Sequence, residues 1–235
     1  MKFKSLSIVF PAYNEEDNIE ESVRMAVEVA EGLPLESFEV IVVNDGSTDR
    51  TGEIADMLAA GDSRVRIFHH NPNQGYAKAL NTGFINAAKD LVFYSDSDLQ
   101  FDLHELKNLL PAIEDYDIVS GFRIYRYDPL TRLFLSWGFN LLVRTIFRIR
   151  VRDIDCAFKL YRKSIFDKIK IRTRDFFVDS EILAKARKAG FSMTEIGVRH
   201  YPRKAGRSTV RASHILKTLR ELAKIWAEIH LGRDR

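Results

Sequence analysis

The sequence contains very little cysteine and no long apolar run. Cys156 is the only cysteine among 235 residues, so no internal disulfide can form, which is typical of a reducing compartment. The first ten residues lack the apolar core of a secretory signal peptide, and no stretch reaches the ~18 consecutive apolar residues of a membrane span. We therefore expect a cytoplasmic protein that is either soluble or peripheral to a membrane.

An excess of charge of one sign is also missing. The formal net charge is +3, which is too small to indicate nucleic-acid binding. The basic residues are unevenly placed, because residues 199–220 include seven arginines and lysines and no acidic residue. Such a segment attracts phosphates or anionic lipid headgroups, although the same charges also suit a solvated helix face.

The chain has no internal repeat, low-complexity tract or long linker. Its composition, with 46% hydrophobic and 29% charged residues, fits a single globular domain with a small terminal appendage. We predict that this domain covers residues 1–210. Residues 211–235 are predicted to form a C-terminal amphipathic helix, which faces a membrane, a second copy of the chain or the domain itself.

The first half of the chain alternates between apolar runs and helical segments. Strands are predicted at 6–10, 38–43, 65–68 and 91–94, and from 118. Helices are predicted at 15–31, 47–60, 76–88 and 103–113. Asn14, and Ser47 or Thr48, are candidate N-caps. The alternation predicts an α/β fold with a mostly parallel, Rossmann-like sheet that is flanked by helices.

The second half is more irregular. Helical periodicity is found at 129–149, 179–189 and 214–231, a strand is predicted at 191–198, and residues 153–161 form a strand or a loop. The last helix is strongly amphipathic, with apolar residues at helical spacing. The fold class is therefore α/β with amphipathic helices toward the C-terminus.

Polar clusters follow three of the predicted strands at the point where each strand ends. They cover residues 11–15, 44–49 and 95–100. In parallel α/β sheets the carboxyl ends of the strands lie at one edge, and ligands bind there. We therefore expect the three clusters to form one site.

The third cluster contains two carboxylates, Asp96 and Asp98, two residues apart. Crowded carboxylates repel each other, and a divalent cation removes that cost. Gln100 is a third oxygen donor at the same spacing, and oxygen-only ligands favour Mg²⁺ or Mn²⁺. The cluster is a candidate metal site, although two aspartates at this spacing are also common in turns and helix caps.

Four segments in this order resemble family 2 inverting glycosyltransferases with the GT-A fold: PAYNEE at 11–16, VNDGSTD at 43–49, NQGYAKALN at 73–81 and DSDLQ at 96–100. The resemblance implies a site for a nucleotide-diphosphate sugar. It implies that the base and ribose are bound by Pro11, Ala12, Tyr13, Glu15, Asp45 and Asp96. It also assigns the metal and diphosphate to Asp96, Asp98 and Gln100. Lys78 either contacts donor phosphate or is an exposed helical lysine.

The second half is similar to the polyprenyl-phosphate sugar synthases, a branch that includes dolichyl-phosphate mannose synthase. The matching residues lie at 121–123, 132–140, 152–162 and 201–208. The resemblance implies a mobile loop in which Arg203 contacts the donor phosphate. The chain departs from the branch at Ala157, where glycine is usual, and at Thr209, where lysine is common.

An acceptor with a phosphate group also agrees with the residue pattern. Arg132, Ser136, Asn140 and Arg144 recur every four residues and so share one helix face. Arginine binds phosphate through its planar fork, so Arg123, Arg132 and Ser136 are candidates for acceptor binding. The alternative is an ordinary amphipathic helix that packs on the core.

A phosphate acceptor relaxes the catalytic requirement. A phosphate monoester is already largely ionised at neutral pH, so no base has to remove a proton. Asp98, Asp153 and Arg123 are the candidate catalytic residues, with Asp153 orienting the acceptor or an arginine, or acting as a base. Asp179 and Glu181 either reach the sugar or complement a helix N-terminus.

The sequence therefore predicts an enzyme that transfers a sugar from GDP-mannose or a UDP-sugar to a polyprenyl or dolichyl phosphate, with inversion. The expected partners are the nucleotide sugar, the lipid phosphate and the cytoplasmic face of a membrane. One alternative is a family 2 glycosyltransferase that acts on a sugar acceptor in surface polysaccharide synthesis. A second is a non-catalytic module that binds a nucleotide sugar.

Overall fold

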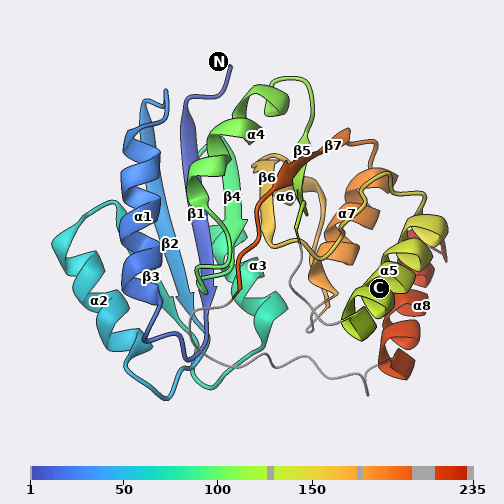
Figure 1. The fold of residues 1–235 in the computed structure, drawn as a ribbon, viewed down its shortest axis with the longest axis horizontal. Helices are drawn as coiled ribbons and strands as arrows, with labels where there is room; N and C mark the ends of the chain where they lie inside the picture. The colour runs from blue at the N-terminus through green and yellow to red at the C-terminus, as the bar shows by residue number, and fades with distance from the viewer. Residues whose placement is uncertain (1, 126–129, 174–176, 203–214, 232–235) are drawn as a thin grey trace.

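The computed structural model describes residues 2–125, 130–173, 177–202 and 215–231. Their strands form one sheet in the order β3-β2-β1-β4-β6-β5-β7 (Figure 1). The strands are β1 (Ser5–Ala12), β2 (Ser37–Asn44), β3 (Val65–His69), β4 (Leu91–Ser95), β5 (Ile118–Arg123), β6 (Phe158–Arg162) and β7 (Met193–Val198). β6 alone among them runs antiparallel to its neighbours. The predicted mostly parallel α/β sheet is confirmed.

Helices connect the strands, largely where the sequence predicts them. They are α1 (Ile19–Glu31), α2 (Thr51–Gly61), α3 (Tyr76–Asn86), α4 (Leu106–Ile113), α5 (Leu130–Phe147), α6 (Ile165–Lys168), α7 (Val178–Lys188) and α8 (Ile215–Leu231), with a 3₁₀ turn, η1 (Leu103–Glu105), before α4. The four-residue helix α6 was not predicted, because so short an element has no periodicity to detect.

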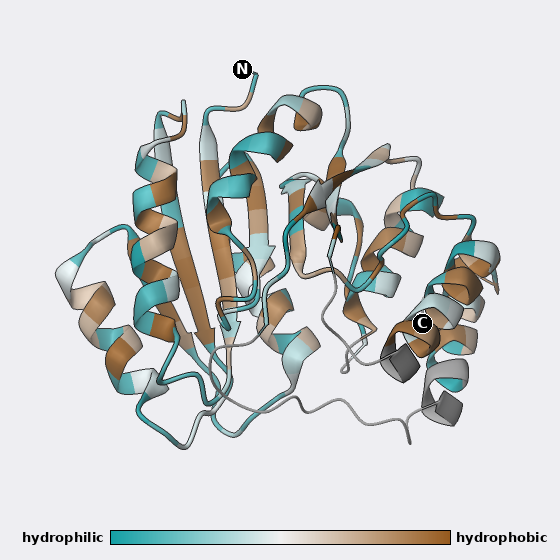
Figure 2. Ribbon diagram, in the orientation of Figure 1, coloured by the Kyte–Doolittle hydropathy of each residue, from teal (hydrophilic) through white to brown (hydrophobic). Residues whose placement is uncertain are grey.

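The core follows from the central strands. After their first residues, β1 and β2 are buried without alternation, so both faces of the sheet are covered. Figure 2 shows these strands as mainly apolar ribbons beside helices of mixed character. Helix α3 approaches β1 so closely that a Cβ at Gly83 would lie 2.3 Å from Cγ1 of Val9. This position therefore requires glycine.

The predicted N-caps are wrong. Asn14 has a left-handed backbone with φ of 55°, and α1 begins only after Asn18. The side chain of Asn14 accepts a hydrogen bond from the Thr48 amide at 2.9 Å, and Ser47 Oγ accepts one from the Asn14 amide at 3.0 Å. The polar groups thus join two loops at the sheet edge instead of capping the helices that follow them.

Helices α5, α7 and α8 pack together at one end of the molecule (Figure 1). α8 buries Leu222 and Ile225, and Glu228 forms an ion pair with Lys185 of α7 at 3.0 Å. The described part of the C-terminal helix therefore packs on the domain. The predicted boundary at 210 lies outside the described residues. None of the helices described here combines the length and the apolar character needed to cross a bilayer.

Candidate active site

The carboxyl ends of β1, β2 and β4 bring the three polar loops to one edge of the sheet, the edge toward which β1 and β2 point in Figure 1. Ala12 pairs with Asn44 in register, and the Asp45 amide donates a hydrogen bond to the Ala12 carbonyl at 2.8 Å. Ser97 Oγ donates to the Pro11 carbonyl at 3.1 Å. These bonds join the loops at 11–15, 44–49 and 95–100 into one floor.

The residues predicted to contact the base lie on this floor. Pro11 and Ala12 are buried at the end of β1, whereas Tyr13 leaves 47% of its surface exposed, which suits a ring that stacks on a flat base. The Glu15 amide donates to Thr51 Oγ1 at 2.8 Å, and Asn18 donates to the Glu15 carboxylate at 2.7 Å.

Asp45 connects β2 to the loop before α3. Its carboxylate accepts hydrogen bonds from the amides of Gln74 at 2.9 Å and Gly75 at 2.8 Å, and from His70 Nδ1 at 2.7 Å. The neighbouring Gly46 has φ of 69°, and a Cβ there would lie 2.6 Å from the Asn73 amide nitrogen. The close approach of the loop after β2 to the loop before α3 therefore depends on Asp45 and Gly46.

Asp96 and Asp98 follow β4 on the same floor. Tyr76 donates its hydroxyl to Asp96 Oδ1 at 2.9 Å, and Asp98 accepts the Gln100 amide at 3.1 Å. Burial raises the pKa of Tyr76 well above its usual value, and the charges of Asp96, Asp179 and Asp98 raise it further. The Tyr76 hydroxyl, which is bonded to Asp96, thus also lies within electrostatic range of Asp98.

The donor set fits a hard divalent cation. The two carboxylates and the Gln100 side-chain carbonyl offer oxygen ligands, and the Gln100 nitrogen donates to the Tyr201 carbonyl at 2.9 Å. Within the ranges that the structure describes, no group of three or more His, Cys, Asp and Glu side chains is arranged to bind a metal ion. The candidate set contains two acidic residues and an amide, so Mg²⁺ or Mn²⁺ would need further oxygens from substrate or water.

Lys159 of β6, Tyr94 of β4 and Asp179 of α7 form a buried polar cluster. The antiparallel pairing sets Lys159 opposite Tyr94, and Lys159 Nζ forms an ion pair with Asp179 of α7 at 2.9 Å. Tyr94 donates its hydroxyl to the same Asp179 oxygen. Burial and then the charge of Asp179 raise the pKa of Tyr94 well above its usual value. Asp179 therefore neutralises a buried lysine.

Glu181, in the first turn of α7, has a similar structural role. It is buried, and it accepts hydrogen bonds from the amides of Arg172 at 2.9 Å and Thr173 at 2.8 Å. It also accepts one from Lys185 Nζ at 2.6 Å. These contacts fix the segment that precedes α7, and they favour the helix-terminus interpretation of Glu181 over contact with a sugar.

Arg123 and Asp153 form a two-bonded pair beside the cluster. Arg123 Nε and Nη2 donate to the Asp153 carboxylate at 2.7 Å and 2.6 Å, and the Arg123 side chain is only 11% exposed. Burial disfavours the charged guanidinium, but the hydrogen bonds and charge of Asp153 outweigh it and raise the pKa of Arg123. Of the roles considered for Asp153, orientation of an arginine agrees best with these contacts.

Asp155 is a candidate that the sequence analysis missed. It lies three residues before Phe158, which pairs with Ser95 at the end of β4, so Asp155 belongs to the same edge as Asp96. Burial raises the pKa of Asp155 to about 7; Asp179 and Asp153 add to the rise, and Lys159 and Arg123 oppose it. The Asp153–Asp155 spacing repeats that of Asp96 and Asp98, which was the available signal.

This titration gives a testable effect on stability. The pKa of Asp155 is about 7 in the folded protein, compared with an ordinary value of 3.8. The folded state therefore favours the protonated carboxyl, whose contribution to the free energy of unfolding is complete below about pH 4 and is lost as the pH rises through about 7. We expect Asp155→Asn to raise the free energy of unfolding by about 1–2 kcal/mol at about pH 8, and not at about pH 4. Urea unfolding at both pH values measures this; an equal effect at both would contradict it.

Of the remaining predicted residues, the structure describes the side chains of Lys78 and Ser136. Lys78 is exposed in the first turn of α3. Ser136 lies in α5, where Asn140 donates to its carbonyl at 2.9 Å. Arg132 also lies in α5, but its side chain is outside the description, and Arg203 lies outside the described residues.

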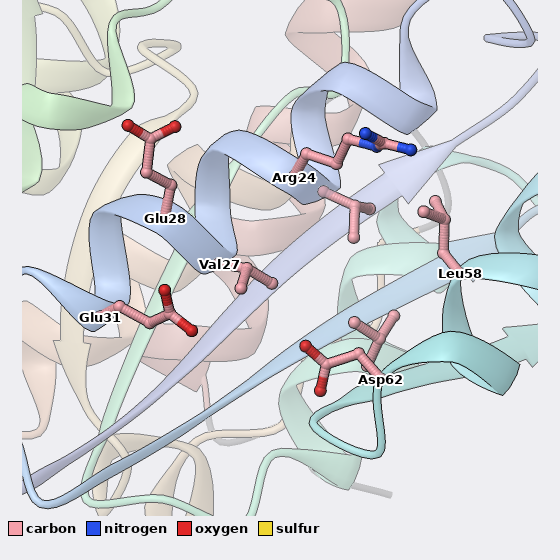
Figure 3. Close-up of a pocket in the computed structure, with 8 residues that line it drawn as sticks. Arg24, Val27, Glu28, Glu31, Leu58 and Asp62 are labelled. Atoms are coloured by element: carbon pink, nitrogen blue, oxygen red, sulfur yellow. The ribbon is translucent and has the colours of Figure 1, made fainter.

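Two grooves in the described surface lie away from this edge. One, of about 220 Å³, lies between α1 and α2 and is lined by Val27, Leu58 and several charged residues (Figure 3). The other, of about 600 Å³, lies toward the amino ends of β2 and β3 and is lined in part by Phe38 and Arg66. Neither includes a residue of the three loops, so neither bears on the candidate site.

The sheet order, with one antiparallel strand between β4 and β5, defines a GT-A-type fold. Glucosyl-3-phosphoglycerate synthase from Mycobacterium tuberculosis, crystallised with Mn²⁺, UDP and phosphoglyceric acid, has this fold: the TM-score is 0.70 at 18% identity over 96% of this chain and 78% of that chain. The chain belongs to glycosyl transferase family 2, whose family profile matches residues 7–170.

Two curated relatives are longer than the part of them that matches this chain. Glycosyltransferase AglD from Haloferax volcanii is 38% identical over 208 residues, which are 84% of this chain and 33% of AglD. Undecaprenyl-phosphate 4-deoxy-4-formamido-L-arabinose transferase from Salmonella choleraesuis is 30% identical over 224 residues, which are 93% of this chain and 66% of the relative. The chain thus spans only part of the length of either protein.

Proposed function

We propose that the protein transfers a sugar from a nucleotide-diphosphate sugar to a polyprenyl phosphate, with inversion at the anomeric carbon. The observation that carries this proposal is the position of the loop of Asp96 and Asp98, which Ser97 joins to the end of β1 and Tyr76 joins to α3, at the same sheet edge as the loops after β1 and β2. Family membership supports the reaction class, and the name of the undecaprenyl-phosphate relative supports the acceptor class.

The donor is proposed to lie across the loops after β1, β2 and β4. Its base would stack on Tyr13 and donate a hydrogen bond to the Asp45 carboxylate. Pro11, Ala12 and Glu15 would surround the base and the ribose. Lys78 and Arg203 remain candidates for the donor phosphates. Asp96, Asp98 and Gln100 would bind Mg²⁺ or Mn²⁺, which when bound neutralises charge on the departing diphosphate.

The acceptor phosphate is proposed to bind at Arg123, with Arg132 and Ser136 supplied by α5. Asp153 positions the Arg123 fork through two hydrogen bonds, so the guanidinium is preorganised for an oxyanion. The phosphate is already largely ionised at neutral pH. The residues therefore need only to align two anionic substrates and reduce their repulsion.

A sugar acceptor is the second candidate, and Asp155 is the observation that favours it. A hydroxyl acceptor needs a base, and a carboxylate with a pKa of about 7 suits that task. Asp179 and Glu181, which the sequence offered for contact with the sugar, are instead bonded to Lys159, Tyr94, Lys185 and backbone amides.

Incubation with polyprenyl phosphate and a panel of radiolabelled nucleotide sugars, with Mn²⁺ or with EDTA, tests the proposal. We expect one donor to label the lipid with Mn²⁺ and none to do so with EDTA. Labelling of a soluble sugar but not of the lipid would favour the second candidate. Nucleotide binding with no transfer to either acceptor would indicate a non-catalytic module.

The face that meets the lipid is proposed to be α5. Phe134, Trp137 and Leu141 follow helical spacing and are exposed, with 71% of Phe134 and 60% of Trp137 accessible. Arg148 and Arg150, just beyond the end of α5, are exposed too and add positive charge. Exposed aromatic side chains on a helix whose end is followed by arginines suit the headgroup region, which supports peripheral binding at the cytoplasmic face of a membrane.

Replacement of the two aromatics provides a test of this surface. We expect the double variant Phe134→Ser/Trp137→Ser to bind anionic vesicles at least about tenfold more weakly, because each aromatic contributes about 1.5–3 kcal/mol on burial. Vesicle sedimentation measures it. Met57→Ser, which changes an exposed apolar residue of α2, is the matched control. Equal binding by all three proteins would contradict the assignment to α5.

A further inference from the structure

His70 lies directly after β3 and joins the donor floor to α3. Its Nδ1 is 2.7 Å from Asp45 Oδ1, and its Nε2 is 2.9 Å from Thr82 Oγ1. A carboxylate can only accept, so Nδ1 carries the proton and donates to Asp45. Nε2 is engaged in a hydrogen bond with the Thr82 hydroxyl. Both ring nitrogens are thus satisfied in a buried position.

The donors around Asp45 are divided unequally between its two oxygens. Among the residues that the structure describes, Oδ1 accepts from His70 Nδ1 and from the Gln74 amide at 2.9 Å, whereas Oδ2 accepts only from the Gly75 amide at 2.8 Å. A carboxylate oxygen offers about two acceptor positions. Oδ1 is therefore saturated, and a single position remains, on Oδ2. The side chain is 4% exposed, so little more than one contact can reach it.

The two bases considered for the donor differ in what they present to a carboxylate. Uracil offers one N–H, at N3, between two carbonyl groups. Guanine offers N1–H and the exocyclic N2–H side by side, and this pair matches two carboxylate oxygens. A carboxylate with one saturated oxygen can accept the single N–H of uracil, but it leaves one guanine donor unpaired, and an unpaired buried donor is costly.

We propose that His70, by saturating Oδ1 of Asp45, makes the donor site selective for a uracil nucleotide over a guanine nucleotide. This inference rests on the proposed function, since it assumes that a nucleotide base meets Asp45. His70 is a positioning residue in this scheme, because it acts on the base through Asp45 and does not touch the donor.

Two substitutions at His70 separate the hydrogen bond from the ring. Asparagine can present an amide N–H near the place of Nδ1, and leucine has similar size but no donor. Both lose the contact with Thr82, so they share any general loss of packing. Isothermal titration of the full chain with UDP and with GDP, each with Mn²⁺, gives a Kd ratio for each protein. A merely structural defect weakens both nucleotides alike and leaves that ratio unchanged.

We expect wild-type protein and His70→Asn to bind UDP at least about tenfold more tightly than GDP, and His70→Leu to lose most of this preference. Equal binding of UDP and GDP by the wild type would overturn the inference and leave the nucleotide-sugar proposal intact. An unchanged ratio in His70→Leu would overturn the role of His70. Binding of neither nucleotide to the wild type would overturn the donor assignment itself.

Discussion

Asp98→Asn is expected to lower kcat by at least about 100-fold, because it removes one of two charges that would hold the cation beside the departing diphosphate. The fold should persist, since the side chain of asparagine also has an oxygen that can accept the Gln100 amide at the position where Asp98 accepts it now. Transfer of radiolabelled sugar and the apparent affinity for Mn²⁺ are the two measurements.

Asp102→Asn is the matched control for that substitution. Asp102 lies four residues further along, where it accepts the His104 amide at 3.0 Å at the start of η1. The Asp102→Asn substitution removes one negative charge, as Asp98→Asn does, from nearly the same part of the chain. A loss of activity of similar size in both variants, or an unchanged Mn²⁺ affinity in Asp98→Asn, would contradict the metal assignment.

Lys159→Met is expected to lower the free energy of unfolding by about 3–5 kcal/mol, because it leaves Asp179 as a buried charge without its cation. Lys159 is fully buried, and its Nζ lies 2.9 Å from Asp179 Oδ1. Methionine preserves the length of the aliphatic stem, so lost packing is a small part of the effect. Urea unfolding followed by circular dichroism measures the change.

The double variant Lys159→Met/Asp179→Asn separates charge from packing. It removes both partners, so we expect it to be more stable than Lys159→Met alone. If the double variant were less stable by the sum of both single effects, the two residues would be acting independently. The ion pair would then not explain the burial of Lys159.

The sequence alone located most of the first half of the fold. β1, β2 and β4 were predicted because mainly apolar runs are required where both faces of a sheet are buried. The position of the three polar loops at one edge followed from the parallel arrangement of those strands. Tyr13, Asp96 and Asp98 were found in this way, because they lie next to the strands that position them.

Residues whose environment depends on distant segments were not found in this way. Asp155 and His70 lie in short loops with no periodicity. Their significance depends on the charge of Asp179 in α7 and on the hydrogen bond to Asp45, directly after β2. Asn14 and Ser47 were assigned to helix caps, the nearest available use of their polar groups. In the structure each bonds to the other's loop, a long-range contact that local spacing does not encode.

The sequence by itself thus determined the element types, the mostly parallel sheet and the chemistry of the edge loops, because each is encoded by neighbouring residues. Only the tertiary structure decided the antiparallel insertion of β6 between β4 and β5. That insertion sets Lys159 against Tyr94 and Asp179, and it brings the loop of Asp153 and Asp155 to the donor edge. Strand pairing between distant segments is settled by the packing of the whole domain, so no local pattern could specify these neighbours.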